Sequence, residues 1–178
     1  MIPADLVPPD CPWPIVLGLD PGTRVAGYGA VVEAPRGPRL VCCGVLEPGA
    51  RLSLVERLGR IAVEFEELLG ALRPRMVVVE STFAGRNVQS ALRIGEARGA
   101  VLATAARLGF PTDEVAPAAA KKTLVGHGAA SKEQVAAMVA QLLGCAPLDV
   151  AHDATDALAL ALTHVIRGRS PAGPARSR

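Results

Sequence analysis

The sequence predicts an α/β fold in which a five-stranded mixed sheet is flanked by helices. Uninterrupted apolar runs at 14–19 and 76–79 are typical of strands that are covered on both faces. The spacing of apolar residues gives the element order β-β-β-α-β-α-β-α-α-α. Because a strand–helix–strand connection joins parallel neighbours and short turns join antiparallel ones, this order requires a mixed sheet.

The first three strands are expected to form an antiparallel meander. The segments GYGAVV at 27–32 and RLVCCGVL at 39–46 follow the first apolar run PIVLGL, and Gly and Pro residues break the chain between them. The fourth strand is RMVVVE at 75–80, and TDEVAP at 112–117 contains a short fifth strand. Each of these later strands follows a helical segment, which predicts that both join the sheet by crossovers.

Two helix starts carry a recognisable cap. Ser53 is followed by Glu56, and Ser131 is followed by Gln134, so each pair has the spacing of a capping box. Apolar residues recur at helical spacing after each Ser, with charged residues between them. The sequence therefore predicts helices that begin at these two positions. Further helices are expected at about 118–125 and 150–166.

The helix expected at about 87–108 is unusually rich in small residues. Gly95 and Gly99 lie in its middle, where glycine weakens an isolated helix. Close packing of this helix, against the sheet or against another chain, would explain their presence. The helix is therefore also a candidate dimer interface.

The 178-residue chain is long enough for one domain with a sizeable core, and half of its residues are apolar. We expect a folded domain at 14–167, a disordered Pro-rich extension at 1–13 and a basic flexible tail at 168–178. The formal net charge of +2 excludes a bulk polycation but is compatible with acids and bases on separate patches.

Composition also bears on location. No apolar run approaches the ~20 residues of a membrane helix, and the first residues lack the basic and apolar regions of a signal peptide. The four cysteines form no CxxC pair, so we expect reduced thiols. A cytoplasmic protein is the expectation.

Two carboxylates end the two most apolar strands. Asp20 follows the first run and Glu80 closes the fourth strand. If these strands are parallel neighbours, they lie ~4.8 Å apart and their ends coincide at one edge of the sheet. Two carboxylates side by side repel each other unless a cation separates them, and a divalent metal prefers oxygen ligands. The pattern predicts a metal site at this edge.

The last helix offers two more acids. Asp153 and Asp156 are three residues apart and therefore share one face of the helix. Asp153 alone could be a helix cap, whereas Asp156 precedes the apolar run ALALAL and needs a partner if it is buried. His152 is an additional candidate ligand. Four converging carboxylates suit a site in which two metal ions hydrolyse a phosphodiester.

Four segments together resemble one known family. They are LGLDPGTRVAGYGAVV, VVVESTFAGRNVQSALRIGEARGAVL, KKTLVGHGAASKEQVAAMV and HDATDALALALTH, in this order along the chain. The chain is similar over about 15–164 to the bacterial RuvC endonucleases, the Holliday-junction resolvases. The resemblance implies a ribonuclease-H-like fold, a homodimer and symmetric cleavage of four-way DNA junctions with two Mg²⁺ or Mn²⁺ ions per active site. It also implies the RuvA–RuvB branch-migration complex as a partner.

The resemblance also assigns residues. Its acidic metal ligands fall on Asp20, Glu80, Asp153 and Asp156, and its aromatic wedge at the junction centre falls on Phe83. Its basic region, implicated in DNA binding or catalysis, matches Lys121 and Lys132, although Lys122 beside Lys121 leaves open which of the two faces the scissile phosphate. The residues expected to contact DNA phosphates are Arg86, Arg93, Lys121, Lys122 and Lys132, of which Arg93 could equally lie on a solvated helix face.

Two other readings remain open at this point. The segment DPGT at 20–23 also fits the first phosphate loop of actin-type and heat-shock-type ATPases and sugar kinases. Those enzymes close two domains over a nucleotide, whereas this chain has the length of one and shows no second phosphate loop. A non-catalytic junction-binding module, or a nuclease of broader structure selectivity, is the second alternative.

Overall fold

The computed structural model describes residues 11–81 and 88–169. Its elements follow the predicted order. The strands are β1 (Ile15–Asp20), β2 (Ala26–Ala34), β3 (Gly37–Leu46), β4 (Met76–Glu80) and β5 (Thr112–Val115). The helices are α1 (Leu54–Leu72), α2 (Val88–Arg107), α3 (Pro117–Val125), α4 (Lys132–Leu143) and α5 (His152–Arg169).

The five strands form one mixed sheet in the order β3-β2-β1-β4-β5. Strand β1 is antiparallel to β2 and parallel to β4, and β4 is parallel to β5. In the β1–β4 register Leu19 lies opposite Val79, so the next residues, Asp20 and Glu80, end their strands side by side. The predicted adjacency of the two strands is confirmed.

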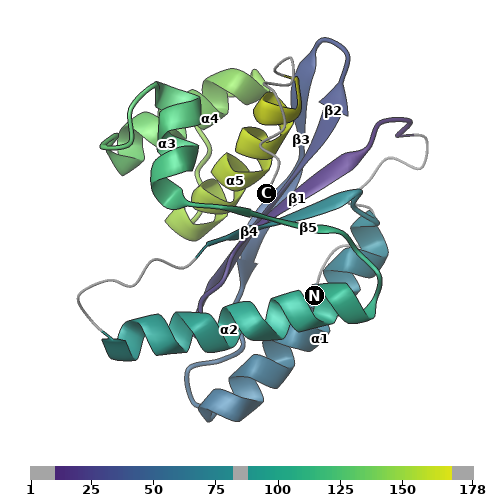
Figure 1. Cartoon of the computed structure of the whole chain (residues 1–178), viewed down its shortest axis with the longest axis vertical. Helices are drawn as coiled ribbons and strands as arrows, with labels where there is room; N and C mark the ends of the chain where they lie inside the picture. Colours follow the sequence, from purple (N-terminus) through teal and green to yellow (C-terminus); the bar gives the residue numbers. More distant parts are fainter. Residues whose placement is uncertain (1–10, 82–87, 170–178) are drawn as a thin grey trace, which may run out of the picture.

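Helices cover both faces of the sheet (Figure 1), with α1 and α2 on one side and α3, α4 and α5 on the other. Side chains of β1 alternate between these layers: Leu17 and Leu19 join the core with α1, and Val16 joins the core with α5. Phe65 of α1 is fully buried in the first core and Leu158 of α5 in the second. The sheet is thus buried on both faces, as its apolar strands predict.

Helix α5 crosses the sheet at very short range because glycines face it. A Cβ atom added to Gly18 of β1 would collide with the carbonyl of Ala157, and one added to Gly27 of β2 would collide with the carbonyl of Asp153. These glycines let the helix backbone rest directly on the strands. The contact fixes the first turn of α5 beside the end of β1, where Asp20 lies.

The capping boxes predicted at two helix starts are confirmed. Ser53 accepts a hydrogen bond from the backbone of Glu56, and the Glu56 side chain accepts one from Ser53 N. Ser131 and Gln134 form the same reciprocal pair at the start of α4. All four cysteines are free thiols, as expected. Among the described helices, none has the length and apolar character needed to cross a membrane.

Of the two explanations offered for Gly95 and Gly99, packing against the sheet is wrong. A Cβ atom built on either glycine would meet no atom within 4 Å in the described chain. The buried residues of α2 are Ala97, Val101, Thr104 and Ala105, which lie on its opposite side. The glycines therefore face outwards, because α2 turns another face towards α1 and the sheet.

Candidate active site

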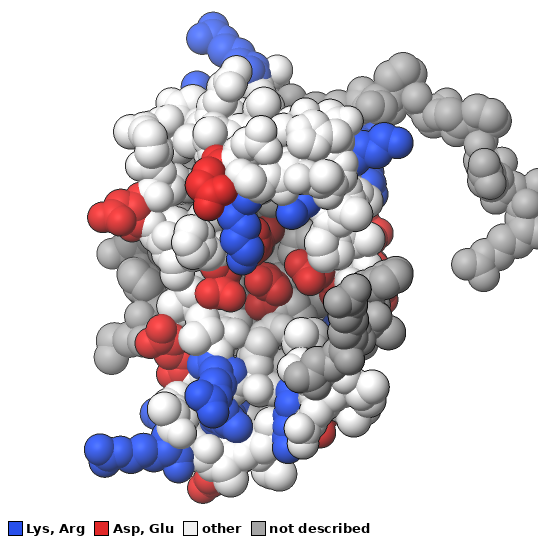
Figure 2. Space-filling model, turned by 90° about the vertical axis from the view of Figure 1, so that its left-hand side faces the viewer, with Lys and Arg blue, Asp and Glu red and all other residues white. Residues whose placement is uncertain are grey.

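Three of the predicted acids meet in one pocket at the carboxyl ends of β1 and β4. The pocket has a volume of about 310 Å³ and is lined by Asp20, Glu80 and Asp156 together with Lys121 and Lys132. Ala120, Val135 and Leu160 contribute to its apolar wall. Figure 2 shows acidic side chains gathered in a hollow in the middle of one face, with Lys and Arg side chains above and below them.

Each acid is placed by its own element. Asp20 and Glu80 are the last residues of β1 and β4, and the parallel register aligns these two ends. Asp156 lies one turn into α5, which the glycine contacts hold against β1. Arg98 of α2 donates from Nε to the carbonyl of Glu80 at 3.2 Å and forms an ion pair with Glu114 of β5. Arg98 therefore ties the end of β4 to α2 and to β5.

Crowding and burial change the titration of the pocket. Burial, followed by repulsion from Asp156 and Asp153, raises the pKa of Asp20 to about 6. Burial, followed by repulsion from Asp20 and Asp156, raises the pKa of Glu80 to about 7. Lys132 acts against both shifts. Because the pKa of Glu80 is about 7, the pocket holds its full negative charge only above neutral pH or when a cation enters it.

Lys132 is the cation that the chain itself supplies. Its Nζ lies 3.2 Å from Oδ2 of Asp156, and this carboxylate is the main reason why the pKa of Lys132 is raised. The Lys132 side chain is 60% exposed, whereas that of Asp156 is 30% exposed. The lysine therefore reaches into the pocket from the solvent edge, at the start of α4.

The structure distinguishes the two adjacent lysines of α3. Lys121 lines the carboxylate pocket, whereas Lys122 is exposed and is not among its lining residues. Of the two lysines, Lys121 is therefore the one that lies beside the acids. Phe83 and Arg86 lie outside the described residues.

Asp153 does not line the same pocket as the other three acids. It lines a neighbouring, larger pocket, although it is close enough to Asp20 to raise that residue's pKa. One helical turn separates it from Asp156, and the two side chains leave α5 towards different pockets. His152 is exposed and lines neither pocket.

The neighbouring pocket contains residues that the sequence analysis did not single out. Arg24 and Arg57 line it, together with the predicted phosphate contact Arg93. Arg57 follows Leu54 by three residues and precedes Ile61 by four, so it borders the apolar face of α1. The sequence therefore contains a signal that could have identified Arg57, because a charged side chain beside the apolar face of a helix must be accommodated next to the core.

A family model described as "Crossover junction endodeoxyribonuclease RuvC" matches residues 16–164. The chain belongs to the RuvC family. It is 45% identical to the crossover junction endodeoxyribonuclease RuvC of Chlorobaculum parvum, over 89% of this chain and 85% of that protein. The protein of the same name from Anaeromyxobacter sp. is also 45% identical, over 86% of this chain and 81% of its own length.

Solved structures agree with this assignment. The RuvC of Thermus thermophilus in complex with a Holliday junction substrate is 38% identical to the chain and has a TM-score of 0.80, over 87% of this chain and 94% of that one. The yeast mitochondrial Holliday junction resolvase Ydc2 has a TM-score of 0.60 at 14% identity, which shows a shared fold alone. The ribonuclease-H-like fold is confirmed, and the ATPase alternative is wrong, because the family match spans most of the chain.

Proposed function

We propose that the pocket formed by Asp20, Glu80 and Asp156 hydrolyses phosphodiester bonds at four-way DNA junctions. The observation that carries the proposal is the meeting of three mutually repelling carboxylates, next to two lysines, in a member of the RuvC family. The T. thermophilus relative was solved with a Holliday junction substrate. Cleavage of two opposed strands at such a junction is the reaction we assign to this chain.

The donor set fits a divalent metal. All three side chains offer carboxylate oxygens, the ligands that Mg²⁺ and Mn²⁺ prefer, and their repulsion would be relieved by a cation. In two-metal nucleases the ions supply activation of water and stabilisation of the leaving oxygen. We assign the ligand role to Asp20, Glu80 and Asp156, with Asp153 as the fourth carboxylate and His152 as an additional candidate.

The side chains must rotate to complete such a site. In the part of the chain that the structure describes, no three acidic, histidine or cysteine side chains already converge on one metal position. Lys132 holds Asp156 by an ion pair, which must loosen if Asp156 turns towards Asp20 and Glu80. The freed ammonium group would then be available to a DNA phosphate. Lys121, on the same wall, is suited to the same contact.

We further propose a homodimer formed through α2. Val88 and Leu92 are 71% and 63% exposed, and they share one side of the helix with Gly95 and Gly99. Since a side chain at either glycine would meet nothing within this chain's described residues, a second backbone can approach there closely. A two-fold dimer matches the two-fold symmetry of a four-way junction. The RuvA–RuvB complex stays a prediction from the resemblance.

The decisive experiment compares a mobile four-way junction with a linear duplex of the same sequence, each incubated with Mg²⁺ or Mn²⁺. We expect paired, symmetric nicks in the junction alone. Asp20→Asn and Glu80→Gln variants should still bind the junction but should not cut it. Cutting of both substrates at equal rates would instead support the nuclease of broader selectivity. Full activity of both variants would contradict the assignment of the pocket.

A further inference from the structure

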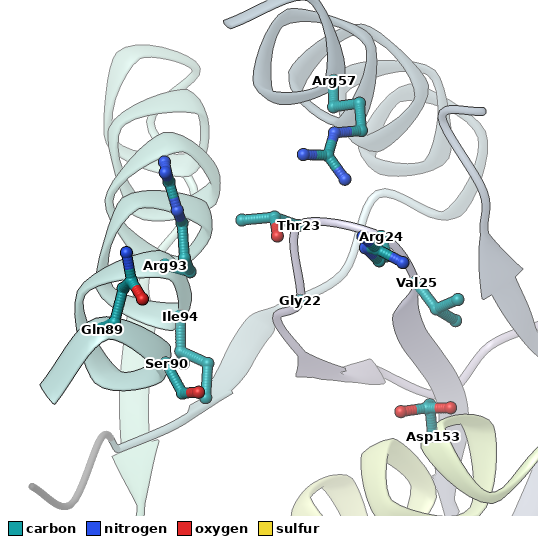
Figure 3. Close-up of a pocket in the computed structure, with 10 residues that line it drawn as sticks. All are labelled: Gly22, Thr23, Arg24, Val25, Arg57, Gln89, Ser90, Arg93, Ile94 and Asp153. Atoms are coloured by element: carbon teal, nitrogen blue, oxygen red, sulfur yellow. The ribbon is translucent and has the colours of Figure 1, made fainter. Parts of the chain in front are cut away.

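The proposed hydrolysis leaves the neighbouring pocket unexplained. It has a volume of about 710 Å³ and is formed by the loop between β1 and β2, helix α1, helix α2 and the first turn of α5. Figure 3 shows these elements around the loop that carries Thr23, with Arg57 on α1, Arg93 on α2 and Asp153 on α5. The polar and charged residues among them are Thr23, Arg24, Arg57, Gln89, Ser90, Arg93 and Asp153.

Most of the charged side chains that line this pocket are positive. Arg24, Arg57 and Arg93, which we call the arginine cluster, oppose the single carboxylate of Asp153. Arg93 is partly neutralised, because its Nη1 lies 3.2 Å from Oε2 of Glu96. The remaining excess of positive charge suits an anionic ligand. Planar guanidinium groups are the side chains best shaped for phosphate oxygens.

Arg57 provides the second observation. Its Nε is buried and has no hydrogen-bond partner among the described residues. In Figure 3 its guanidinium group extends from α1 towards the loop that carries Thr23. A buried donor without a partner costs ~1–3 kcal/mol, so a folded protein that keeps one has another use for it. A ligand oxygen in the pocket would satisfy this group after the Arg57 side chain turns to expose its Nε.

The arginine cluster also adjoins the carboxylate pocket. Asp20 of that pocket is followed within three residues by Thr23, and Asp156 is one helical turn from Asp153. A polyanionic strand whose phosphodiester lies at Asp20 and Asp156 would therefore extend naturally past this cluster. Thr23 and Ser90 contribute hydroxyl groups to the same wall.

We propose that Arg24, Arg57 and Arg93 bind a backbone phosphate of DNA close to the phosphodiester that is cut. This inference rests on the proposed function and adds a phosphate-binding site to it. Arg57 is its central residue, because its Nε lacks a partner and Arg93 already has one. Phosphate contacts of this kind fix the register of a strand and carry no sequence information. The cluster therefore holds the strand in place while the acids act.

The test compares Arg57→Gln with Arg60→Gln. Arg60 lies on the same helix, but it donates to the carbonyl of Pro48 and pairs with Glu64. Binding of the full-length protein to a four-way junction is measured by fluorescence anisotropy in EDTA, over a series of salt concentrations. We expect Arg57→Gln to weaken binding on the order of tenfold, the size of one charge-assisted hydrogen bond. Its slope of log affinity against log salt should fall by about 0.9, the loss of one phosphate contact.

Thermal unfolding separates binding from a structural role. Because Arg57 Nε is unpartnered, we expect Arg57→Gln to melt at the same temperature as the parent protein or higher. Arg57→Lys keeps the charge, so it should retain most of the salt dependence and lose part of the affinity. An arginine that merely supports the fold would lower the melting temperature and leave the salt slope unchanged.

Three results would overturn the inference. The first is that Arg57→Gln binds the junction as tightly, and with the same salt slope, as Arg60→Gln. The second is that inorganic phosphate stabilises the parent protein through Arg57 while junction binding is indifferent to that residue, which would indicate a site for a small anion. The third is a loss of melting temperature that accounts for the loss of binding. In each case metal-dependent junction cleavage by the parent protein would still stand, so the two proposals fail separately.

Discussion

Replacing Asp20 with Asn removes one negative charge from the crowded pocket and preserves the size of the side chain. The pKa of Asp20 is about 6 in the folded chain, against an ordinary value of 3.8, mainly because of burial and then because of Asp156 and Asp153. Below about pH 3 the carboxyl group is largely protonated in both states and costs the fold little. As the pH rises towards 6, the unfolded chain ionises first, so the wild-type protein loses stability.

The size of this loss follows from the pKa difference. About two units correspond to ~3 kcal/mol at pH 8, since one unit is ~1.36 kcal/mol. Asn carries no charge and escapes this penalty, so Asp20→Asn should be more stable than the wild type by up to this amount. For a chain of this length the gain corresponds to roughly 6–12 °C in melting temperature, and it should fade towards pH 4.

The assay is thermal unfolding followed by circular dichroism in EDTA, from pH 4 to pH 8. Asp149→Asn, a change at an exposed aspartate in the loop before α5, is the matched control and should show no gain. The same Asp20→Asn protein should have lost junction cleavage. An Asp20→Asn protein that is no more stable than the wild type at pH 8, or whose gain is equally large at pH 4, would contradict a burial penalty at Asp20.

Four further predictions concern metal binding, Lys132, the exposed side of α2 and Phe83. Mg²⁺ or Mn²⁺ should raise the melting temperature of the wild type at pH 8 and have little effect on Asp20→Asn, because binding to the folded state alone stabilises it. Lys132→Met should destabilise the metal-free protein at pH 8, because Lys132 lowers the pKa values of Asp20 and Glu80; unfolding curves measure this. Leu92→Glu should shift the protein to monomers in sedimentation experiments and abolish paired nicking. Phe83→Ala should leave junction binding largely intact and slow cleavage in single-turnover assays, since base stacking is worth ~1–3 kcal/mol.

Each of these four predictions would be contradicted by a specific result. Equal stabilisation of the wild type and Asp20→Asn by metal would place the ion elsewhere. A Lys132→Met protein as stable as the wild type at pH 8 would remove the electrostatic role of that lysine. An unchanged sedimentation coefficient of Leu92→Glu, at concentrations where the wild type is dimeric, would move the interface away from α2. An unchanged cleavage rate of Phe83→Ala would indicate that the ring has a structural role and does not act on the DNA.

Much of the fold was predictable because its determinants are local. The capping pairs at Ser53 and Ser131 depend on residues three apart, and the two-sided apolar strands require helices on both faces. The meeting of Asp20 with Glu80 also followed from sequence, since parallel strands that neighbour each other end at one edge. For Gly95 and Gly99 the sequence left packing against the sheet and packing against another chain open, because composition does not say which side of a helix faces the sheet.

From the sequence alone it follows that acids end the two most apolar strands and that two more acids share a face of the last helix. The packing of the elements is what turns Asp153 into a different pocket from Asp156 and places Lys121, rather than Lys122, beside the acids. Packing also placed Arg57, Thr23 and Arg93, which come from separate elements, around one pocket. The physical reason is that periodicity fixes where a side chain lies around its own helix or strand, whereas a pocket depends on how those elements pack against one another.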